Sequence, residues 1–427
     1  MKPPCRFCII PSMEMDESRT ARESEKRPWH ILIILLISLM PATANTFLYS
    51  FVLLSTAKEW GVTPFWAAII GFMPMAVQPV GGLIFGSLSD RYGRRNALLL
   101  TILLSAVSAV LSGISLGPVD FGAYRLVLGM VIGGQWAVTM TLVSEIWPAA
   151  ERGRAVGIVQ TGFPVGFIYA SLIAFWAGTG SGWRPLLMLG GLPALLAAPL
   201  AYFTLRESSL WIVDASQREA RSASYREIFR PDLVKYTLLG TIIVFIGAFG
   251  AWSLNPWIPA YLGVLGIPSE RIPLFTFWIM IGALTGYTLY GFISDKLGRK
   301  LTLRLFFIGM TVGLASFGLV PSRNWFMGDA GHPVVLTVFL GAAATFFLGY
   351  FSGYGSLLAE LFPTRVRSRG LGFCYTIGSI GSAIGPACTG FISSRVGIGN
   401  TFIIVSGIFL IGAAVVSLLP ETKGKRL

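Results

Sequence analysis

Apolar runs, separated by short breaks that carry charges, proline or glycine, cover almost the whole chain after residue 29. A helix needs about 20 mostly apolar residues to cross a bilayer. The runs predict twelve such helices, over residues 30–53, 65–89, 95–114, 120–145, 153–178, 184–204, 236–262, 271–294, 300–320, 333–360, 368–393 and 398–419. Membrane-spanning β-strands would instead give segments of about ten residues that alternate in polarity. We therefore predict an all-α polytopic membrane protein.

The composition supports this fold class. Hydrophobic residues make up 54% of the 427 residues and charged residues 12%, whereas a soluble domain carries about 25% charged residues. The chain has two histidines and four cysteines, and Cys5 and Cys8 form a single C-x-x-C, which is a weak metal or redox signal. With so few histidines and cysteines, we expect no enzyme activity, no cofactor and no metal site.

The surplus of basic residues, 33 Lys and Arg against 20 Asp and Glu, gives a net charge of +13. With a cytoplasmic N-terminus, 27 of the 33 fall on the cytoplasmic side, five fall on the other side, and Arg125 alone lies inside a span. The positive-inside rule then predicts that both termini lie in the cytoplasm. We expect the protein to lie in the inner membrane of a bacterium. Because the basic residues are spread over many short loops, we expect them to face an anionic lipid bilayer and expect no nucleic-acid partner.

The second half of the chain repeats motifs of the first half. Residues 86–95 (GSLSDRYGRR) recur as 291–300 (GFISDKLGRK), and residues 145–148 (EIWP) recur as 360–363 (ELFP). Two parallel repeats of six helices around a central site are typical of a transporter. The predicted organisation is a cytoplasmic tail (1–29), a six-helix bundle (30–204), a cytoplasmic linker (205–235), a second six-helix bundle (236–420) and a cytoplasmic C-tail (421–427).

These motifs resemble the major facilitator superfamily over about residues 30 to 424. The sequence G-x-x-x-D-R-x-G-R-R at 86–95 is the best-known signature of that family, and R-x-x-x-G-x-x-x-G at 125–133 is another. The E-x-x-P-x-x-x-R copies and Pro420-Glu-Thr-Lys-Gly424 resemble the branch that holds sugar porters and the sialate and aromatic-acid proton symporters. The resemblance implies two pseudo-symmetric six-helix bundles, a small-molecule substrate between them, alternating access and a monomer.

The resemblance also implies a cytoplasmic gate built from charged clusters. One half of this latch would hold Asp90, Arg91, Arg94, Glu145, Arg152 and Glu207. The other half would hold Asp295, Arg299, Glu360, Arg367 and Glu421. Helix dipoles stabilise carboxylates at helix N-termini, and Arg–carboxylate contacts fix geometry. Gly86 and Gly291 are expected to let helices approach closely.

The predicted membrane interior holds no carboxylate near its middle, and Arg125 is its one clear charge. Arg125 either attracts an anionic substrate or bonds backbone carbonyls of a neighbouring helix. Relatives often carry an acidic pair in span 1, where this chain has Asn45-Thr46, and Gly-Gly-Glu-Trp in span 4, where it has Gly133-Gly-Gln135-Trp136. Both departures remove a titratable group. Proton coupling would then use another group or the proton of the substrate, or the protein would be a uniporter or exchanger.

Polar and aromatic residues near the predicted midplane are the candidate substrate-binding residues. They are Asn45, Tyr49, Arg125, Gln135, Trp136, Gln160, Tyr169, Trp252, Asn255, Tyr287, Tyr350 and Tyr354, with Gln78 and Tyr375 as further candidates. Amides are favoured because an unsatisfied amide in hydrocarbon costs several kcal/mol. The set predicts secondary transport of a small organic solute, in particular a carboxylate or other organic anion. The alternatives are a uniporter or exchanger of a neutral or aromatic metabolite, a drug exporter, and a non-transporting membrane sensor.

Overall fold

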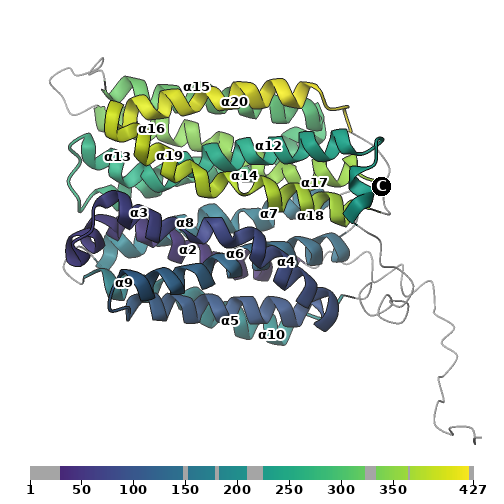
Figure 1. Ribbon diagram of the computed structural model, residues 1–427, viewed down its shortest axis with the longest axis horizontal. Coiled ribbons are helices and arrows are strands. Elements are labelled where there is room, and N and C mark those ends of the chain that lie inside the picture. The colour runs from purple at the N-terminus through teal and green to yellow at the C-terminus, as the bar shows by residue number, and fades with distance from the viewer. Residues whose placement is uncertain are drawn as a thin grey trace, which may run out of the picture.

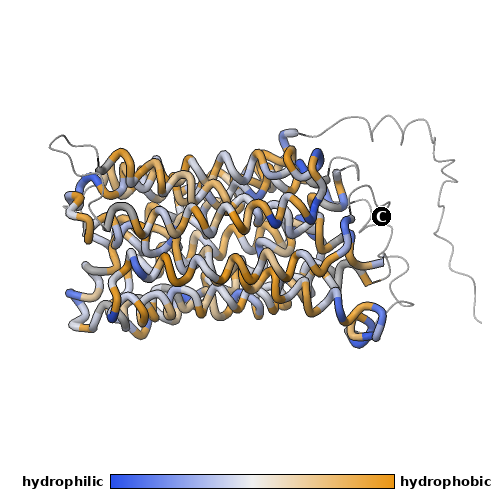
Figure 2. Tube along the Cα trace, turned by 90° about the horizontal axis from the view of Figure 1, so that it is seen from above, coloured by the Kyte–Doolittle hydropathy of each residue, from blue (hydrophilic) through white to orange (hydrophobic). Residues whose placement is uncertain are grey.

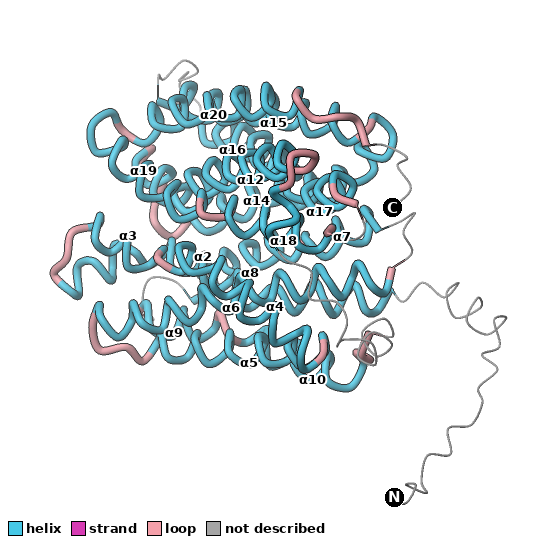
Figure 3. Tube along the Cα trace, turned by 45° about the vertical axis from the view of Figure 1, so that its right-hand side comes forward, coloured by secondary structure: helices cyan, strands magenta, loops and turns pink. Residues whose placement is uncertain are grey.

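The computed structural model describes residues 29–147, 152–177, 182–208, 225–322, 333–363 and 366–422. Within these ranges the chain is almost entirely helical and contains no strand, as Figure 3 shows. Twelve helical segments are long and apolar enough to cross a membrane. The predicted fold class is thereby confirmed. Residues 209–224 of the predicted linker and both ends of the chain, including Cys5 and Cys8, lie outside the described residues.

The twelve spans form two layers of helices, one from each half of the chain (Figure 1). The first layer contains α2 (Trp29–Trp60), α3 (Pro64–Phe72), α4 (Pro74–Tyr92), α5 (Arg94–Gly113), α6 (Pro118–Ile146), α7 (Arg152–Gln160), α8 (Gly162–Ala177), α9 (Trp183–Leu189) and α10 (Leu192–Thr204). The second layer contains η4 (Tyr225–Phe229), α12 (Val234–Leu254), η5 (Asn255–Trp257), α13 (Ile258–Val264), α14 (Ile272–Leu297), α15 (Arg299–Ser322), α16 (Pro333–Phe346), η6 (Phe347–Tyr350), α17 (Phe351–Leu361), α18 (Arg367–Gly378), α19 (Gly381–Val396) and α20 (Ile398–Ser417).

Several spans consist of more than one helix because proline or glycine interrupts them. Pro74 begins α4 directly after α3, and Pro256 lies in the 3₁₀ turn η5 that separates α12 from α13. Proline has no backbone N–H and its ring clashes with the preceding turn, so a helix stops or bends there. In a membrane such breaks are tolerated where the freed backbone groups are buried in protein or line a cavity.

The two ends of the bundle are polar, and the middle is apolar (Figure 2). We call the end where α2 begins at Trp29 and where Thr422 lies the tail end. The opposite end, where the chain turns at Gly61, Gly117, Gly182, Gly266 and Gly397, is the far end.

Glycines on α6 allow it to lie against α4. A Cβ at Gly129 would come within 2.2 Å of the Pro74 carbonyl oxygen, and one at Gly133 would come within 1.9 Å of the Gln78 carbonyl oxygen. Small residues at helix crossings let backbones approach and pack closely in membranes. The expectation for Gly86 was wrong, because no atom lies within 4 Å of the position its Cβ would take. The close approach is made by the glycines of the 125–133 motif.

We expect Gly133→Leu to destabilise the protein strongly, because the added side chain would force α4 and α6 apart. Overpacking a close contact costs about 1–3 kcal/mol, and backbone atoms cannot move aside as a flexible side chain can. The measurement is the midpoint of thermal unfolding of detergent-purified protein, followed by size-exclusion chromatography. Gly86→Leu is the matched control, because no atom lies within 4 Å of the position that the Cβ of residue 86 would take, and equal midpoint shifts for the two variants would contradict this account.

Candidate functional site

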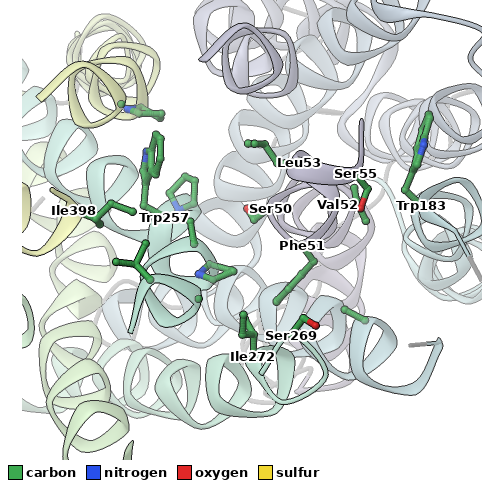
Figure 4. Close-up of a pocket in the computed structure, with 18 of the residues that line it drawn as sticks. Ser50, Phe51, Val52, Leu53, Ser55, Trp183, Trp257, Ser269, Ile272 and Ile398 are labelled. Atoms are coloured by element: carbon green, nitrogen blue, oxygen red, sulfur yellow. The ribbon is translucent and has the colours of Figure 1, made fainter. Parts of the chain in front are cut away.

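A cavity of about 1730 Å³ lies between the two halves at the far end (Figure 4). Ser50 and Phe51 on α2 form one part of its wall, and Trp257 and Ile398 from the second half form another. The mouth includes Lys58, Glu59 and Glu270, which lie at helix ends. Ser50 lies ten residues before the end of α2, so the cavity extends about 15 Å along that helix, given a rise of about 1.5 Å per residue.

Stacked aromatic rings close the bundle on the tail-end side of this cavity. Phe47 on α2 stacks on Trp252 of α12, with ring centroids 5.5 Å apart. Trp136 on α6 stacks on Tyr375 of α18, with centroids 3.4 Å apart. Trp136 also donates its indole N–H to Gln160 Oε1 at 3.0 Å. Because each stack joins the two halves, they form a floor between the cavity and the tail end.

An ion pair joins the two halves at the tail end. Arg154 Nε on α7 donates to Asp295 Oδ2 on α14 at 3.2 Å. Asp295 also accepts from Arg299 Nη1 at 2.6 Å, so one carboxylate holds two guanidinium groups. The Arg154 side chain is 47% exposed, which leaves this pair partly screened by water. The ion pair therefore contributes only a modest free energy of association between the halves, but it sets the position of α7 against α14.

The remaining tail-end charges form two similar clusters, one within each half. Arg94 Nη2 pairs with Glu145 at 3.0 Å, and Glu207 accepts from the backbone N–H of Arg94 at 2.7 Å and of Arg95 at 3.2 Å. Glu207 thereby caps the N-terminus of α5, where a negative charge is favoured. The chain's internal repeat is thus visible in side-chain geometry, because the second half contains the same arrangement.

In that second cluster Arg299 Nε pairs with Glu360 at 3.4 Å, and Glu421 accepts from the backbone N–H of Arg299 at 2.9 Å and of Lys300 at 3.3 Å. Thr422 donates its hydroxyl to Glu360. Burial raises the pKa of the Glu360 carboxyl, although hydrogen bonds from Thr422 and the nearby Arg299 oppose the shift. As pH falls, Glu360 therefore binds a proton more readily than an ordinary glutamate does.

The structure brings the predicted gate residues together, but mainly within each half. Arg94, Glu145 and Glu207 form one cluster, and Asp295, Arg299, Glu360 and Glu421 form the other. Arg91 is exposed at the end of α4, with its guanidinium 5.3 Å from the ring of Tyr92. The side chains of Asp90, Arg152 and Arg367 lie outside the described residues. Arg154, which makes the ion pair between the halves, was missed, although its place two residues after Arg152 in a repeated motif was an available signal.

Arg125 does not reach the cavity. It is fully buried, and its Nε and Nη2 donate to the Gly71 carbonyl at 3.1 and 2.8 Å. Its Nη1 donates to Asn45 Oδ1 at 2.8 Å and to the Asn45 carbonyl at 3.1 Å. The guanidinium also lies 5.1 Å from the centre of the Tyr49 ring. Of the two interpretations, this geometry fits the one in which Arg125 bonds carbonyls of neighbouring helices, because its donors join α2, α3 and α6.

None of the twelve candidate substrate-binding residues is among the described residues that line this cavity. The polar groups of most of these residues form hydrogen bonds with other residues of their own half. Those bonds run from Asn45 to Leu187 O, Tyr49 to Ala67 O, Gln135 to Ser38 O, Tyr169 to Leu189 O, Tyr350 to Gly247 O and Tyr354 to Ile243 O. Tyr287 is buried beside Phe351. Trp136, Gln160 and Trp252 belong to the floor.

Asn255 comes nearest to the cavity, because it precedes two residues that line it, Pro256 and Trp257. Its Oδ1 is buried and has no hydrogen-bond partner in the described structure. The same is true of Ser50 Oγ and Trp257 Nε1, both on residues that line the cavity. Sequence reasoning missed Ser50 and Trp257 because a serine or a tryptophan in a membrane helix carries little signal by itself. The proline break at Pro256 was the clue to this region.

The chain is similar to known proteins in sequence and in fold. A family model described as Major Facilitator Superfamily matches residues 34–347 and 274–427. A probable 4-methylmuconolactone transporter of Cupriavidus pinatubonensis is 30% identical over 388 residues, which cover 88% of this chain and 87% of that protein. The sialic acid transporter NanX of Escherichia coli is 28% identical over 365 residues, which cover 85% of this chain and 87% of NanX.

A crystal structure of a D-xylose–proton symporter has a TM-score of 0.73 to this fold at 21% sequence identity, and the match covers 93% of this chain and 99% of that one. At this identity the likeness concerns the fold alone. The expected family, its transport function and the two-bundle fold are confirmed by the family match together with the curated relatives. The chain belongs to the major facilitator superfamily and is a membrane transporter rather than an enzyme.

Proposed function

We propose that this transporter imports a small organic acid across the inner membrane by alternating access, as a monomer. The observation that carries the proposal is the cavity between the halves, which opens at the far end while the aromatic floor and the Arg154–Asp295 pair close the tail end. Such an arrangement suits one of the two states that alternate during transport. The bundles predicted over residues 30–204 and 236–420 would rock about the floor to give the other state.

The charge distribution supports the orientation. Most Lys and Arg residues belong to segments at the tail end, and cytoplasmic loops of membrane proteins carry such an excess. We therefore assign the tail end, with both termini and the linker, to the cytoplasm. The cavity would then face the outside and receive solute from there.

The substrate class is supported by the relatives and by the cavity wall. One relative is named for sialic acid and another for 4-methylmuconolactone, and both are small oxygen-rich organic compounds. The wall combines apolar and aromatic side chains, such as Phe51 and Trp257, with a few hydroxyl-bearing residues, such as Ser55 and Ser269. A small organic acid with an apolar or ring-shaped body fits such a wall.

Uptake by purified protein in liposomes tests this proposal. The panel is benzoate, other monocarboxylates, sialic acid and D-xylose, each measured with protein-free liposomes as the control for passive entry. We expect saturable uptake of at least one acid, with competition by other acids and none by D-xylose. Saturable uptake of D-xylose without uptake of any acid would overturn the proposed substrate class.

A further inference from the structure

The charged residues of the cavity all lie at its mouth. Among the described residues that line it, the charged ones are Lys58 and Glu59 at the end of α2 and Glu270 just before α14. Glu59 is already paired with Arg184 at 2.7 Å and accepts from the indole N–H of Trp183. The hydrogen bond from Arg184 lowers the pKa of Glu59, which keeps this carboxylate ionised at neutral pH. The mouth therefore carries acids as well as Lys58 and has no surplus of positive charge.

The deeper wall, as far as the structure describes it, carries no charged side chain. Ser50 and Trp257 belong to this wall, but Ser50 Oγ and Trp257 Nε1 are themselves buried and have no partner in the described structure, as is also true of Asn255 Oδ1, next to Pro256. The remaining deep lining includes Phe51, Ala383 and Pro386. Among the described residues, this deeper part of the wall holds no cation that would neutralise a carboxylate.

Arg125, the basic residue in the interior of the described spans, is hydrogen-bonded within the first half and does not line the cavity. Arg125 uses its Nε, Nη1 and Nη2 atoms on Gly71 and Asn45, and its side chain is completely buried. Because no part of this side chain is exposed, a ligand in the cavity cannot reach the guanidinium unless the packing around it changes. The acids nearest the spans lie at helix ends, as do Glu145 and Glu360 at the tail end. Among the described residues, the interior of the spans therefore holds neither a free counter-ion for an anion nor a carboxylate that would carry a proton.

An ionised carboxylate without a counter-ion is costly in such a site, and the usual outcome is that the group binds a proton instead. We propose that the transporter binds and carries its acid in the protonated, neutral form, so that the proton crosses on the substrate. This inference rests on the proposed function. The carboxylate takes up one proton outside, crosses as the uncharged acid and releases that proton in the cytoplasm. One cycle therefore moves one proton and no net charge.

Binding at different pH values tests the proposal. Quenching of tryptophan fluorescence in the detergent-purified protein reports binding, since Trp183 and Trp257 line the cavity. The probes are benzoate and benzamide, an acid and its neutral amide. Above the pKa of the acid, its neutral fraction falls about tenfold per pH unit. The apparent Kd of benzoate should therefore rise about 100-fold from pH 5.5 to 7.5, while that of benzamide stays constant.

Two results would overturn the proposal. A Kd of benzoate that does not change with pH would mean that the anion is bound. Parallel pH profiles for benzoate and benzamide would mean that a group of the protein titrates. At the tail end the candidates are Glu360 and Asp295, which lie near Arg154, Arg299 and Glu421. At the mouth the candidates are Glu59 and Glu270, which lie near Lys58 and Arg184. Absence of binding and uptake for every acid would instead overturn the proposed function, and this inference with it.

A variant with a cation in the cavity provides a matched test. Ala387 on α19 lines the cavity, and Ala387→Arg places a guanidinium there, while Ala387→Gln adds a neutral side chain of similar length. We expect the Arg variant to bind the benzoate anion, so that its Kd varies much less than 100-fold over the same pH range. The Gln variant should keep the steep dependence. Equal pH profiles for the two variants would overturn the proposal.

In proteoliposomes, an inward pH gradient should drive accumulation of the acid, and a membrane potential set with potassium and valinomycin should leave the rate unchanged. Uptake that responds to the potential and not to the pH gradient would show transport of the anion and overturn the proposal. Benzoic acid enters bare liposomes, so the rate through the protein is the difference from protein-free liposomes under the same gradient.

Discussion

Arg125→Met is expected to destabilise the protein strongly and to leave the substrate affinity of the remaining folded protein unchanged. In the native protein, the guanidinium satisfies the Gly71 carbonyl and both oxygens of Asn45 inside a closed space. Methionine fills much of the volume but donates nothing, and each buried acceptor left without a partner costs about 1–3 kcal/mol. Because these acceptors belong to α2 and α3, the variant would weaken the packing of α6 against these two helices.

Two measurements separate this structural role from a role in anion binding. The thermal unfolding midpoint reports stability, and the apparent Kd of benzoate in protein recovered by size exclusion reports the cavity. Arg125→Lys is the control that keeps the charge and loses the planar five-donor group, and it should fall between the wild type and Arg125→Met in stability. A large rise in the Kd of benzoate with an unchanged unfolding midpoint would show that Arg125 binds substrate.

Arg154→Asp is expected to shift the transporter away from the state in which the tail end is closed. The substitution removes the contact between the halves and sets two carboxylates against each other at Asp295. A partly exposed ion pair contributes about 0.2–1 kcal/mol, and like charges destabilise by similar amounts. The combined change corresponds to a shift of several-fold in the ratio of the two states. Because the pair joins the halves, we expect little change in the stability of either half.

The shift can be followed with single reporter cysteines in a background without the native four. Ser352 on α17 is 3% exposed on the tail-end side of the floor, and Ser50 lines the cavity. In Arg154→Asp, labelling of Ser352→Cys by a water-soluble maleimide should speed up, and labelling of Ser50→Cys should slow down. The double variant Arg154→Asp/Asp295→Arg, which swaps the two charges, should restore both labelling rates. Unchanged labelling in the single variant would show that this pair does not hold the gate closed.

The spans and their pairing were predictable because both depend on local composition and on a repeated motif. Twenty apolar residues in a row have few alternatives to a membrane helix, since every backbone group must find a partner within the segment. The recurrence of residues 86–95 at 291–300 likewise predicts that Arg94 and Arg299 have equivalent surroundings. The structure agrees, because Arg94 pairs with Glu145 and Arg299 pairs with Glu360.

The cavity wall was not predictable, because a polar residue in a helix faces either a neighbour or open space, and sequence does not tell which. Asn45, Tyr49 and Gln135 were reasonable candidates for a binding site, yet their side chains satisfy carbonyls within their own half. Ser50, one residue after Tyr49, belongs to the lining of the cavity instead. A helix turns about 100° per residue, so the difference lies in how α2 is rotated against its neighbours.

By itself, the sequence determined the twelve spans, the internal repeat and the charge asymmetry between the two ends, since these follow from the polarity of short segments. Only the tertiary structure decided what each buried polar group does. It placed Arg125 among the carbonyls of α2 and α3 and paired Arg154 with Asp295 across the two halves. It also made Ser50 and Trp257 part of a cavity wall whose charged residues lie at the mouth. The physical reason is that a hydrogen bond or an ion pair depends on distances of about 3 Å between residues far apart in the chain, and such distances are set by helix packing.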